Sequence, residues 1–376
     1  MTGQGHKNIL IFGLISKHPG RNRGGTALSI RRLANFFAGQ GLEVRIVMRD
    51  QGNNHFMLDA LREGVMVSRI RSNSKVSLFM ALCHTAMKQR PEVVLALDTR
   101  ACLIASWLTL LPWLRVNVWA SFRNELNDSH AHVLRRITRR CTGIICNSYG
   151  LARDLARLTG SPTHRIHVIH NLAVSPDIAV LASQPNDHPW LQGMDSPVIC
   201  SAARLVPEKG FAYLIEAFQI VKKAYPSARL IILGEGPLLE SLRHQAICSG
   251  VHDSVDFAGF QKNPWSFMAR AQLFVLPSLI EAFGNVLAEA LSLGIPVVAT
   301  ECPPYGPQEI LEHGRYGRLV PPADSQALAE AVMATLDAPL PTDTLIAGAR
   351  RFTQEAAGLE YCHTLGLDRS CKTGPS

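Results

Sequence analysis

The feature that most constrains the fold of this chain is a pattern of short apolar runs. The runs form two successive series, and a helix-like segment separates each run from the next. The first series includes Ile9–Leu14, Val93–Leu97 and Gly143–Cys146, and the second includes Val198–Ala202 and Leu273–Leu276. A strand that is apolar at nearly every position is buried on both faces, as in a parallel sheet covered by helices. The sequence therefore predicts an α/β chain with two Rossmann-like, doubly wound domains.

The other elements alternate in the same way along the 376 residues, a length that suits two domains. Four prolines between residues 173 and 197 mark a linker region. Two domains joined in this way leave a cleft, where ligands usually bind. The other expected strands are Glu43–Met48, Val116–Ala120, His167–Ile169, Arg229–Leu233, Val255–Phe257 and Pro296–Thr300, and the expected helices include Thr26–Ala38, Phe211–Ala224 and Asn285–Leu291. We expect an N-terminal domain over residues 1–172, a linker over 173–197, a C-terminal domain over 198–345, and a helix crossing back to the first domain plus a loose tail over 346–376.

Composition favours a globular protein of the cytoplasm. Apolar residues make up 47% of the chain and charged residues 18%, which is enough to bury sizeable cores. The nine cysteines form no CxxC motif and several lie in apolar runs, so we expect reduced thiols rather than a disulfide framework or a zinc site. No secretory signal is evident, and the uncharged stretch at 101–114 is too short to cross a bilayer as a helix.

Charge is distributed unevenly between the two halves. Residues 1–180 contain 24 Lys and Arg and 10 Asp and Glu, a net charge of +14, whereas residues 181–376 contain 14 and 20, a net charge of −6. The basic half is expected to meet a polyanion, either an anionic membrane surface, a phosphorylated substrate or nucleic acid. Its basic residues are scattered without a nucleic-acid motif, so nucleic acid is not expected as a partner.

The stretch Glu281–Thr300, EAFGNVLAEALSLGIPVVAT, places one acid in a loop and a second, Glu289, inside the helix expected after Gly284. The free N–H groups and the positive dipole at a helix start bind phosphate, and a glycine lets backbone approach a ligand closely. Carboxylates accept hydrogen bonds from paired hydroxyls, so the two acids suit a sugar and a ribose. The alternative is a surface-loop acid followed by a solvated helix acid.

Further loops suit a diphosphate. Ser201–Gly210, SAARLVPEKG, follows an expected strand and offers Arg204 and Lys209, and such preset cations stabilise a leaving diphosphate. Read alone, each of these loops could also be solvated charge or a simple turn. The glycines at similar positions are Gly234 and Gly236 after a strand, Gly24 and Gly25 at the start of a helix, and Gly306 at the start of a short helix within residues 301–317.

Taken together, these motifs resemble one family, the GT-B fold retaining glycosyltransferases of family 4. The family's most specific mark is the acid pair with seven residues between, Glu281 and Glu289. The resemblance extends to about residue 365 and is stronger in the second half. Phe122-Arg123-Asn124 and the Pro-Pro-Tyr-Gly-Pro run resemble bacterial enzymes that build cell-surface polysaccharides on lipid diphosphate carriers. The motifs are GGT (24–26), NSYG (147–150), VIHN (168–171), AARLVPEKG (202–210), GEGP (234–237), GF (259–260), PSLIEAFGNVLAEALSLGIPVVAT (277–300) and YGPQEILEHGRYGRLVPPAD (305–324).

The resemblance implies a role for each of these residues. Arg204 and Lys209 are expected to bind the donor diphosphate, Glu281 the hydroxyls of the transferred sugar, and Glu289 the ribose. The resemblance also implies a nucleotide diphosphate sugar as co-substrate and no metal, because cationic side chains and helix dipoles neutralise the leaving group. Phe283, Gly284 and Asn285 are expected to bring backbone to the phosphates and sugar, and Gly24 and Gly25 to face the donor from the other domain.

The chain departs from the family in its first domain. Many relatives carry a histidine near the sugar, after a strand like Val116–Ala120, but this chain reads ASFRNELND there. Arg123 or Asn124 is expected to replace the histidine and to touch the acceptor phosphate, and Asp98 is a further candidate. His130 and His132 are expected on a helix surface, and His170 as a packed residue.

A lipid-linked acceptor would require contact with the inner face of the plasma membrane. Residues 130–141, HAHVLRRITRRC, place an apolar stripe beside four arginines, as expected for a basic amphipathic helix that rests on a membrane. The alternative is a domain helix with its charged face outward. Two rival functions are a nucleotide-sugar epimerase of the same architecture and a non-catalytic anion-binding protein. The sugar, the nucleotide base, the acceptor, the linkage and the oligomeric state do not follow from the sequence.

Overall fold

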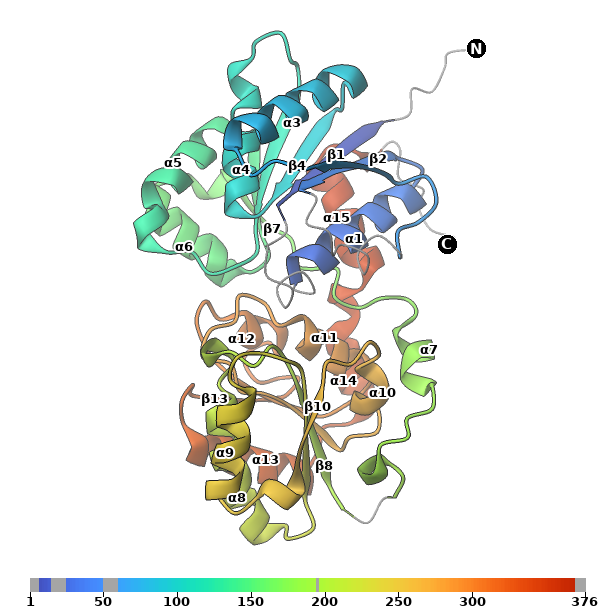
Figure 1. Ribbon diagram of the computed structural model, residues 1–376, viewed down its shortest axis with the longest axis vertical. Helices are drawn as coiled ribbons and strands as arrows, with labels where there is room; N and C mark the ends of the chain where they lie inside the picture. Colours follow the sequence, from blue (N-terminus) through green and yellow to red (C-terminus); the bar gives the residue numbers. More distant parts are fainter. Residues whose placement is uncertain (1–6, 15–24, 50–59, 194–195, 369–376) are drawn as a thin grey trace. The chain divides into compact units, whose positions relative to one another are not determined.

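Two parallel sheets, each in its own structural unit, make up the protein (Figure 1). The computed structural model describes residues 7–14, 25–49, 60–193 and 196–368. One unit comprises residues 1–172 with 354–376, and the other comprises residues 173–353. The segment expected as a linker, 173–197, thus belongs to the second unit, where its helix α7 (Ile178–Ser183) packs against α10 (Trp265–Met268).

The sheet of the first unit has the strand order β3-β2-β1-β4-β5-β6-β7, and the paired strands run parallel. The order reverses between β1 and β4, as in a doubly wound sheet. The strands are β1 (Asn8–Gly13), β2 (Glu43–Arg49), β3 (Met66–Ile70), β4 (Val93–Leu97), β5 (Asn117–Phe122), β6 (Gly143–Cys146) and β7 (Ile166–Val168). The helices are α1 (Gly25–Gly39), α3 (Lys75–Gln89), α4 (Thr99–Ala105), α5 (Ala131–Arg140), α6 (Tyr149–Thr159) and α15 (Gln354–Thr364).

Helices cover both faces of this sheet because successive side chains of a strand point to opposite faces. Ile9 and Ile11 of β1 pack in a core with α1 and α15, whereas Leu10 and Phe12 pack in a second core with α3, α4, α5 and α6. The C-terminal helix α15 lies beside α1, although more than 300 residues separate them in the sequence (Figure 1). The doubly wound architecture expected from the sequence is confirmed.

The sheet of the second unit has the order β10-β9-β8-β11-β12-β13, again parallel, and its order reverses between β8 and β11. Its strands are β8 (Val198–Ala202), β9 (Arg229–Leu233), β10 (Val255–Gly259), β11 (Leu273–Leu276), β12 (Val297–Thr300) and β13 (Arg318–Val320). Besides α7 and α10, its helices are α8 (Phe211–Ala224), α9 (Leu239–Cys248), α11 (Asn285–Ser292), α12 (Gly306–Ile310), α13 (Ser325–Asp337) and α14 (Thr342–Ala349).

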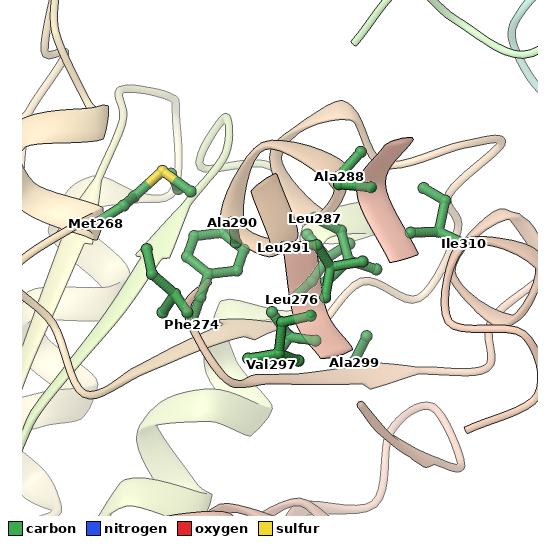
Figure 2. Packing of buried hydrophobic residues seen from close by; sticks show 14 of the residues in the cluster. Met268, Phe274, Leu276, Leu287, Ala288, Ala290, Leu291, Val297, Ala299 and Ile310 are labelled. Carbon is green, nitrogen blue, oxygen red and sulfur yellow. The ribbon is translucent and has the colours of Figure 1, made fainter. Parts of the chain in front are cut away.

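The second sheet is also covered on both faces, by α8, α9 and α13 on one side and by α7, α10, α11, α12 and α14 on the other. Figure 2 shows Leu287 and Leu291 of α11 packed over Leu276 and Val297. Burying a Leu side chain of this kind contributes about 1.5 to 3 kcal/mol. This packing fixes the helix that carries Glu289.

Two strands were missed by the sequence analysis, and both lie at sheet edges. Met66–Ile70 has no fully buried residue, and Arg318–Val320 is three residues long with one buried residue. An edge strand packs less of its surface, so it lacks the continuous apolar run that identifies an inner strand. The expectation of reduced thiols also needs a correction. Seven described cysteines are free, but Cys362 is disulfide-bonded. The absence of a CxxC motif did not exclude this single disulfide.

Candidate functional site

The loops that follow β8 and β11 lie at the point where the second sheet reverses its strand order. The two strands pair directly, with Leu273 opposite Ile199, although β9 and β10 lie between them in the sequence. Parallel neighbours end at the same edge of a sheet, so the loop with Arg204 and Lys209 meets the loop with Glu281. Such switch points are where ligands bind in open α/β sheets.

An ion pair joins the two loops. Lys209 Nζ lies 2.5 Å from Glu281 Oε2, and each side chain keeps 16% of its surface exposed. The buried Ser278 Oγ donates a longer hydrogen bond of 3.4 Å to the same carboxylate oxygen. A short charge-assisted contact with little solvent around it is stronger than an exposed ion pair. The structure thus brings together two of the residues singled out in the sequence.

Backbone contacts hold the same loops in register. The N–H groups of Leu279 and Ile280 donate to the carbonyl of Glu208 at 2.8 and 3.2 Å. Gly210 lies directly beneath Pro277, with φ of 65°, and a Cβ on Gly210 would lie 2.0 Å from the Pro277 carbonyl oxygen. Only glycine fits at this position without moving one of the two loops.

The side chain of Arg204 is exposed, and its guanidinium forms no hydrogen bond or ion pair with any described residue. Its loop packs against Gly234 and Gly236, two of the glycines named above. A Cβ on Gly234 would lie 1.9 Å from the Ala203 carbonyl oxygen, and one on Gly236 would lie 2.3 Å from that of Leu205. These glycines therefore let the turn after β9 pack against the backbone on either side of Arg204, whose guanidinium remains available for an anion.

The start of α11 is built from close backbone packing. Gly284 caps the helix with φ of 99°, and Asn285 is its first residue. The Phe283 ring is buried edge-on against Phe352, 5.4 Å between centroids, and so anchors this loop in the core. Gly306 is the first residue of α12, and a Cβ added to it would lie 2.5 Å from the Phe283 Cα. The expected phosphate contacts of these residues stay predictions.

Glu289 lies on the buried side of α11 and is only 3% exposed. Trp265 at the start of α10 donates its indole N–H to Glu289 Oε2 at 3.0 Å. Glu289 is therefore not the solvated helix acid of the alternative interpretation. A ribose that contacted this carboxylate would itself be largely enclosed.

In the first unit, Arg123 follows β5 and is buried. It donates one hydrogen bond to Asn171 Oδ1 at 2.5 Å and another to the Tyr361 hydroxyl of α15 at 2.6 Å. No described carboxylate forms an ion pair with this guanidinium, so neutral side chains hold a buried cation. Asn171 lies in the VIHN motif named above, but its contact with Arg123 was not predicted. Tyr361 was missed, because no motif signals a tyrosine recruited from 238 residues away.

Asn124 is exposed and forms no hydrogen bond within the described ranges. Of the glycines expected to face the donor from this unit, Gly25 is the first residue of α1, and Gly24 lies outside the described residues.

Asp98 lies at the reversal point of the first sheet, just after β4. Its Oδ1 accepts from Ala101 N and its Oδ2 from Leu14 N, both at 2.8 Å, so the carboxylate bridges the ends of β4 and β1. Its φ of 86° is a strained value for a residue with a Cβ. Burial raises the pKa of Asp98 to about 6, against the opposing effect of these hydrogen bonds.

The helix expected to rest on a membrane is a domain helix. Leu134 and Ile137 of α5 and the following Cys141 are buried in the core of the first unit, so this apolar stripe is not available to lipid. Sequence alone could not separate the two possibilities, because an apolar helical stripe has the same spacing whether it faces a core or a bilayer. His130 and His132 are exposed, as expected. Within the described ranges, no helix is long and apolar enough to cross a membrane.

Metal ligands are not grouped in the described part of the chain: no three His, Cys, Asp or Glu side chains there are placed to hold an ion. The independence from metal that the family resemblance implies stays a prediction.

Comparisons with known proteins match both halves of the chain. The family described as Glycosyltransferase Family 4 matches residues 23–173, and the family described as Glycosyl transferases group 1 matches residues 184–352. The lipopolysaccharide core biosynthesis glycosyltransferase LpsE of Rhizobium meliloti (strain 1021) is 29% identical over 311 residues, covering 82% of this chain and 84% of that protein.

A more local match is the exopolysaccharide phosphotransferase SCO2592 of Streptomyces coelicolor, which is 40% identical over 157 residues, 40% of this chain but 17% of that protein. The crystal structure of Anabaena HepE in complex with UDP is similar in fold, with a TM-score of 0.76 and 23% identity over 95% of this chain and 99% of that one.

Replacing Gly210 tests whether the two loops depend on their close approach. Gly210→Ala is expected to lower the free energy of unfolding by more than about 3 kcal/mol, because it adds a backbone clash to the strain of a positive φ. Gly250→Ala is the matched control, since Gly250 has a φ of 68° and a Cβ added there would meet nothing within 4 Å. It should cost about 1 to 2 kcal/mol from the strain alone. Equal losses in urea unfolding would contradict the packing described here.

Asp98 gives a pH dependence with a definite sign. Its pKa of about 6 lies above the value of 3.8 for an unperturbed Asp, so its contribution to stability is present at low pH and is lost as pH rises through 6. Between pH 5 and 7.5 this one carboxyl should lower the free energy of unfolding by about 1 kcal/mol. Asp98→Asn should remove that part of the pH dependence in chemical unfolding. An unchanged pH profile in the variant would show that Asp98 does not titrate in this range.

Proposed function

The chain belongs to the GT-B glycosyltransferases of family 4, and we propose that it is a retaining enzyme that uses a nucleotide diphosphate sugar. The acceptor we propose is a glycan or a lipid-linked sugar in the synthesis of a bacterial cell-surface polysaccharide. LpsE is named for lipopolysaccharide core biosynthesis and SCO2592 is named an exopolysaccharide phosphotransferase, which supports this choice of acceptor class. HepE was crystallised with UDP, which supports a nucleotide as the donor carrier.

The observation that carries the proposal is the ion pair of Lys209 with Glu281 at the switch point of the second sheet, with exposed Arg204 in the same loop as Lys209. In the reaction, the bond between the anomeric carbon and the donor phosphate oxygen breaks, and a bond to the acceptor oxygen forms. The diphosphate leaves with the bonding electrons, and the proton that the acceptor hydroxyl loses passes to the diphosphate or to water. Cations fixed beside the leaving group stabilise its developing charge, which is a large term in catalysis of this kind.

The roles we propose for these residues are those that the family resemblance implies. Exposed Arg204 and paired Lys209 would hold the diphosphate, Glu281 the hydroxyls of the transferred sugar, and Glu289 the ribose. Gly284 and Asn285 would offer backbone N–H groups at the start of α11. Arg204 presents a fork of donors and Lys209 a point charge, which together suit a diphosphate.

Neither rival function is favoured. An epimerase would interconvert a free nucleotide sugar without an acceptor, and the relatives named above are transferases. A non-catalytic anion-binding protein would not need a carboxylate beside its lysine, because Glu281 lowers the positive charge that such a site would present.

The acceptor side is proposed to lie at the carboxyl edge of the first sheet, where Asp98, Arg123 and Asn124 follow neighbouring strands β4 and β5. Exposed Asn124 is the residue of this group best placed to contact an acceptor phosphate or sugar. Arg123 is bonded to Asn171 and Tyr361, so its proposed contribution is a positive field and a fixed edge of the sheet.

Peripheral membrane contact is proposed through α3 rather than through α5. Besides its buried face, α3 exposes Val76, Met80 and Met87 along one side, and Phe79 contacts Trp107 at 5.6 Å between ring centroids. The segment that follows Trp107 exposes Leu110 and Trp113. The segment 75–115 contains five Lys and Arg and two Asp and Glu, which favours an anionic surface.

Removing Glu281 or Lys209 should abolish transfer while the protein stays folded. Glu281→Ala and Lys209→Ala are each expected to reduce sugar transfer at least about 100-fold, measured as nucleoside diphosphate release with a lipid-linked acceptor fraction. Lys223→Ala, which changes an exposed lysine of α8, is the control. Full activity in both site variants would remove the assignment.

Glu281→Gln separates catalysis from binding. It should reduce transfer like Glu281→Ala, yet it should not weaken nucleoside diphosphate binding, because Lys209 loses a competing carboxylate. Weaker binding in Glu281→Gln would mean that the carboxylate itself supports the diphosphate site.

The membrane proposal predicts that Trp113→Glu weakens binding to vesicles of phosphatidylcholine and phosphatidylglycerol at least about tenfold, since burial of a large apolar side chain contributes about 1.5 to 3 kcal/mol. Ile247→Glu, on α9 of the other unit, is the control because Ile247 is similarly exposed. The proposal would be contradicted if both variants co-sedimented with the vesicles as much as the original protein does. It would also be contradicted if vesicle binding depended on Arg136 and Arg139 of α5 instead.

A further inference from the structure

Trp265 makes a contact that none of the proposed roles uses. Its indole N–H lies 3.0 Å from Glu289 Oε2, and an indole N–H can only donate a hydrogen bond. The partner is an acid that is 3% exposed. A buried carboxylate needs fixed donors, because leaving it without them costs several kcal/mol. The indole N–H therefore supplies one of the hydrogen-bond donors that the buried Glu289 carboxylate needs.

The element that carries Trp265 is itself fixed in place. The side-chain amide of Asn263, just before α10, donates to the Leu181 carbonyl at 2.7 Å, and Arg270, just after it, donates to the Ala182 carbonyl at 3.1 Å. These bonds tie both ends of α10 to α7. The indole ring also packs against the core that holds α11 in place. Both partners of the Trp265–Glu289 hydrogen bond thus sit on anchored helices.

We infer that Trp265 is a positioning residue that fixes the Glu289 carboxylate for the ribose hydroxyls of the donor. This inference rests on the proposed donor site and adds to it a residue from another helix. A bond to one carboxylate oxygen orients the whole planar group, so the other oxygen takes a defined direction. Loss of the indole N–H would remove one fixed donor from the carboxylate, and the ribose would lose part of its contact.

The test compares nucleotides with and without ribose hydroxyls. Binding of UDP and GDP, and of their 2′,3′-dideoxy analogues, is measured by calorimetry for the original protein and for Trp265→Phe. If Trp265 acts through the ribose, Trp265→Phe weakens whichever ribonucleotide binds by about tenfold, in line with loss of a hydrogen bond to a charged group. Its dideoxy analogue, which cannot use Glu289 in this way, should change by less than about twofold.

Two further variants sharpen the comparison. Trp265→His keeps a ring N–H and should recover part of the preference for the ribonucleotide. Trp190→Phe is the matched control, because Trp190 lies in the same unit, packs against the same core and forms no hydrogen bond with Glu289. It should leave both affinities within about twofold.

Three results would overturn the inference. Equal weakening of the ribonucleotide and the dideoxy analogue would mean that Trp265 shapes the site without acting on the ribose. A fall of more than about 10 °C in the midpoint of thermal unfolding of Trp265→Phe would assign the residue a structural role instead. If the original protein bound neither UDP nor GDP, both the proposed donor site for these nucleotides and the inference would be wrong. The first two results, by contrast, would contradict the inference and leave the donor site in place.

Discussion

The ion pair between Lys209 and Glu281 is the interaction on which the rest of the proposed donor site depends. It needs two strands that are neighbours in space but not in sequence, and a glycine that lets their loops touch. The first of these loops also carries exposed Arg204, and the second leads into α11. A site assembled from backbone contacts in this way keeps its charges in place before a ligand arrives, which is what electrostatic stabilisation of a leaving group requires.

The two units contribute different side chains to the proposed donor and acceptor sites. The second unit supplies fixed charges at its switch point and a buried acid held by Trp265. The first unit supplies a strained Asp98 that bridges two strand ends and a buried Arg123 tied to the C-terminal helix. Because Tyr361 reaches Arg123 from α15, the end of the chain helps to fix the edge of the sheet on which we place the acceptor.

The parts of the fold that could be predicted are those with a local signal. Val93–Leu97 and Leu273–Leu276 were predicted with the bounds that the structure has, because inner strands are apolar throughout. The edge strand Met66–Ile70 has no such signal and was missed. Glu281 and Lys209 were both named from the sequence, but their pairing was not, since it depends on strand order rather than on periodicity. Trp265 and Tyr361 were missed because their partners lie 24 and 238 residues away.

The most direct test of the donor site is calorimetric titration of the protein with UDP, GDP, ADP and CMP in the presence of EDTA. We expect one nucleoside diphosphate to bind without metal, and Lys209→Ala to weaken that binding at least about tenfold by removing a cation from the diphosphate. Binding that requires a divalent metal would contradict the metal-independent mechanism. Binding that is equal in Lys209→Ala, or no binding to the folded protein, would contradict the central claim that these two loops hold the donor.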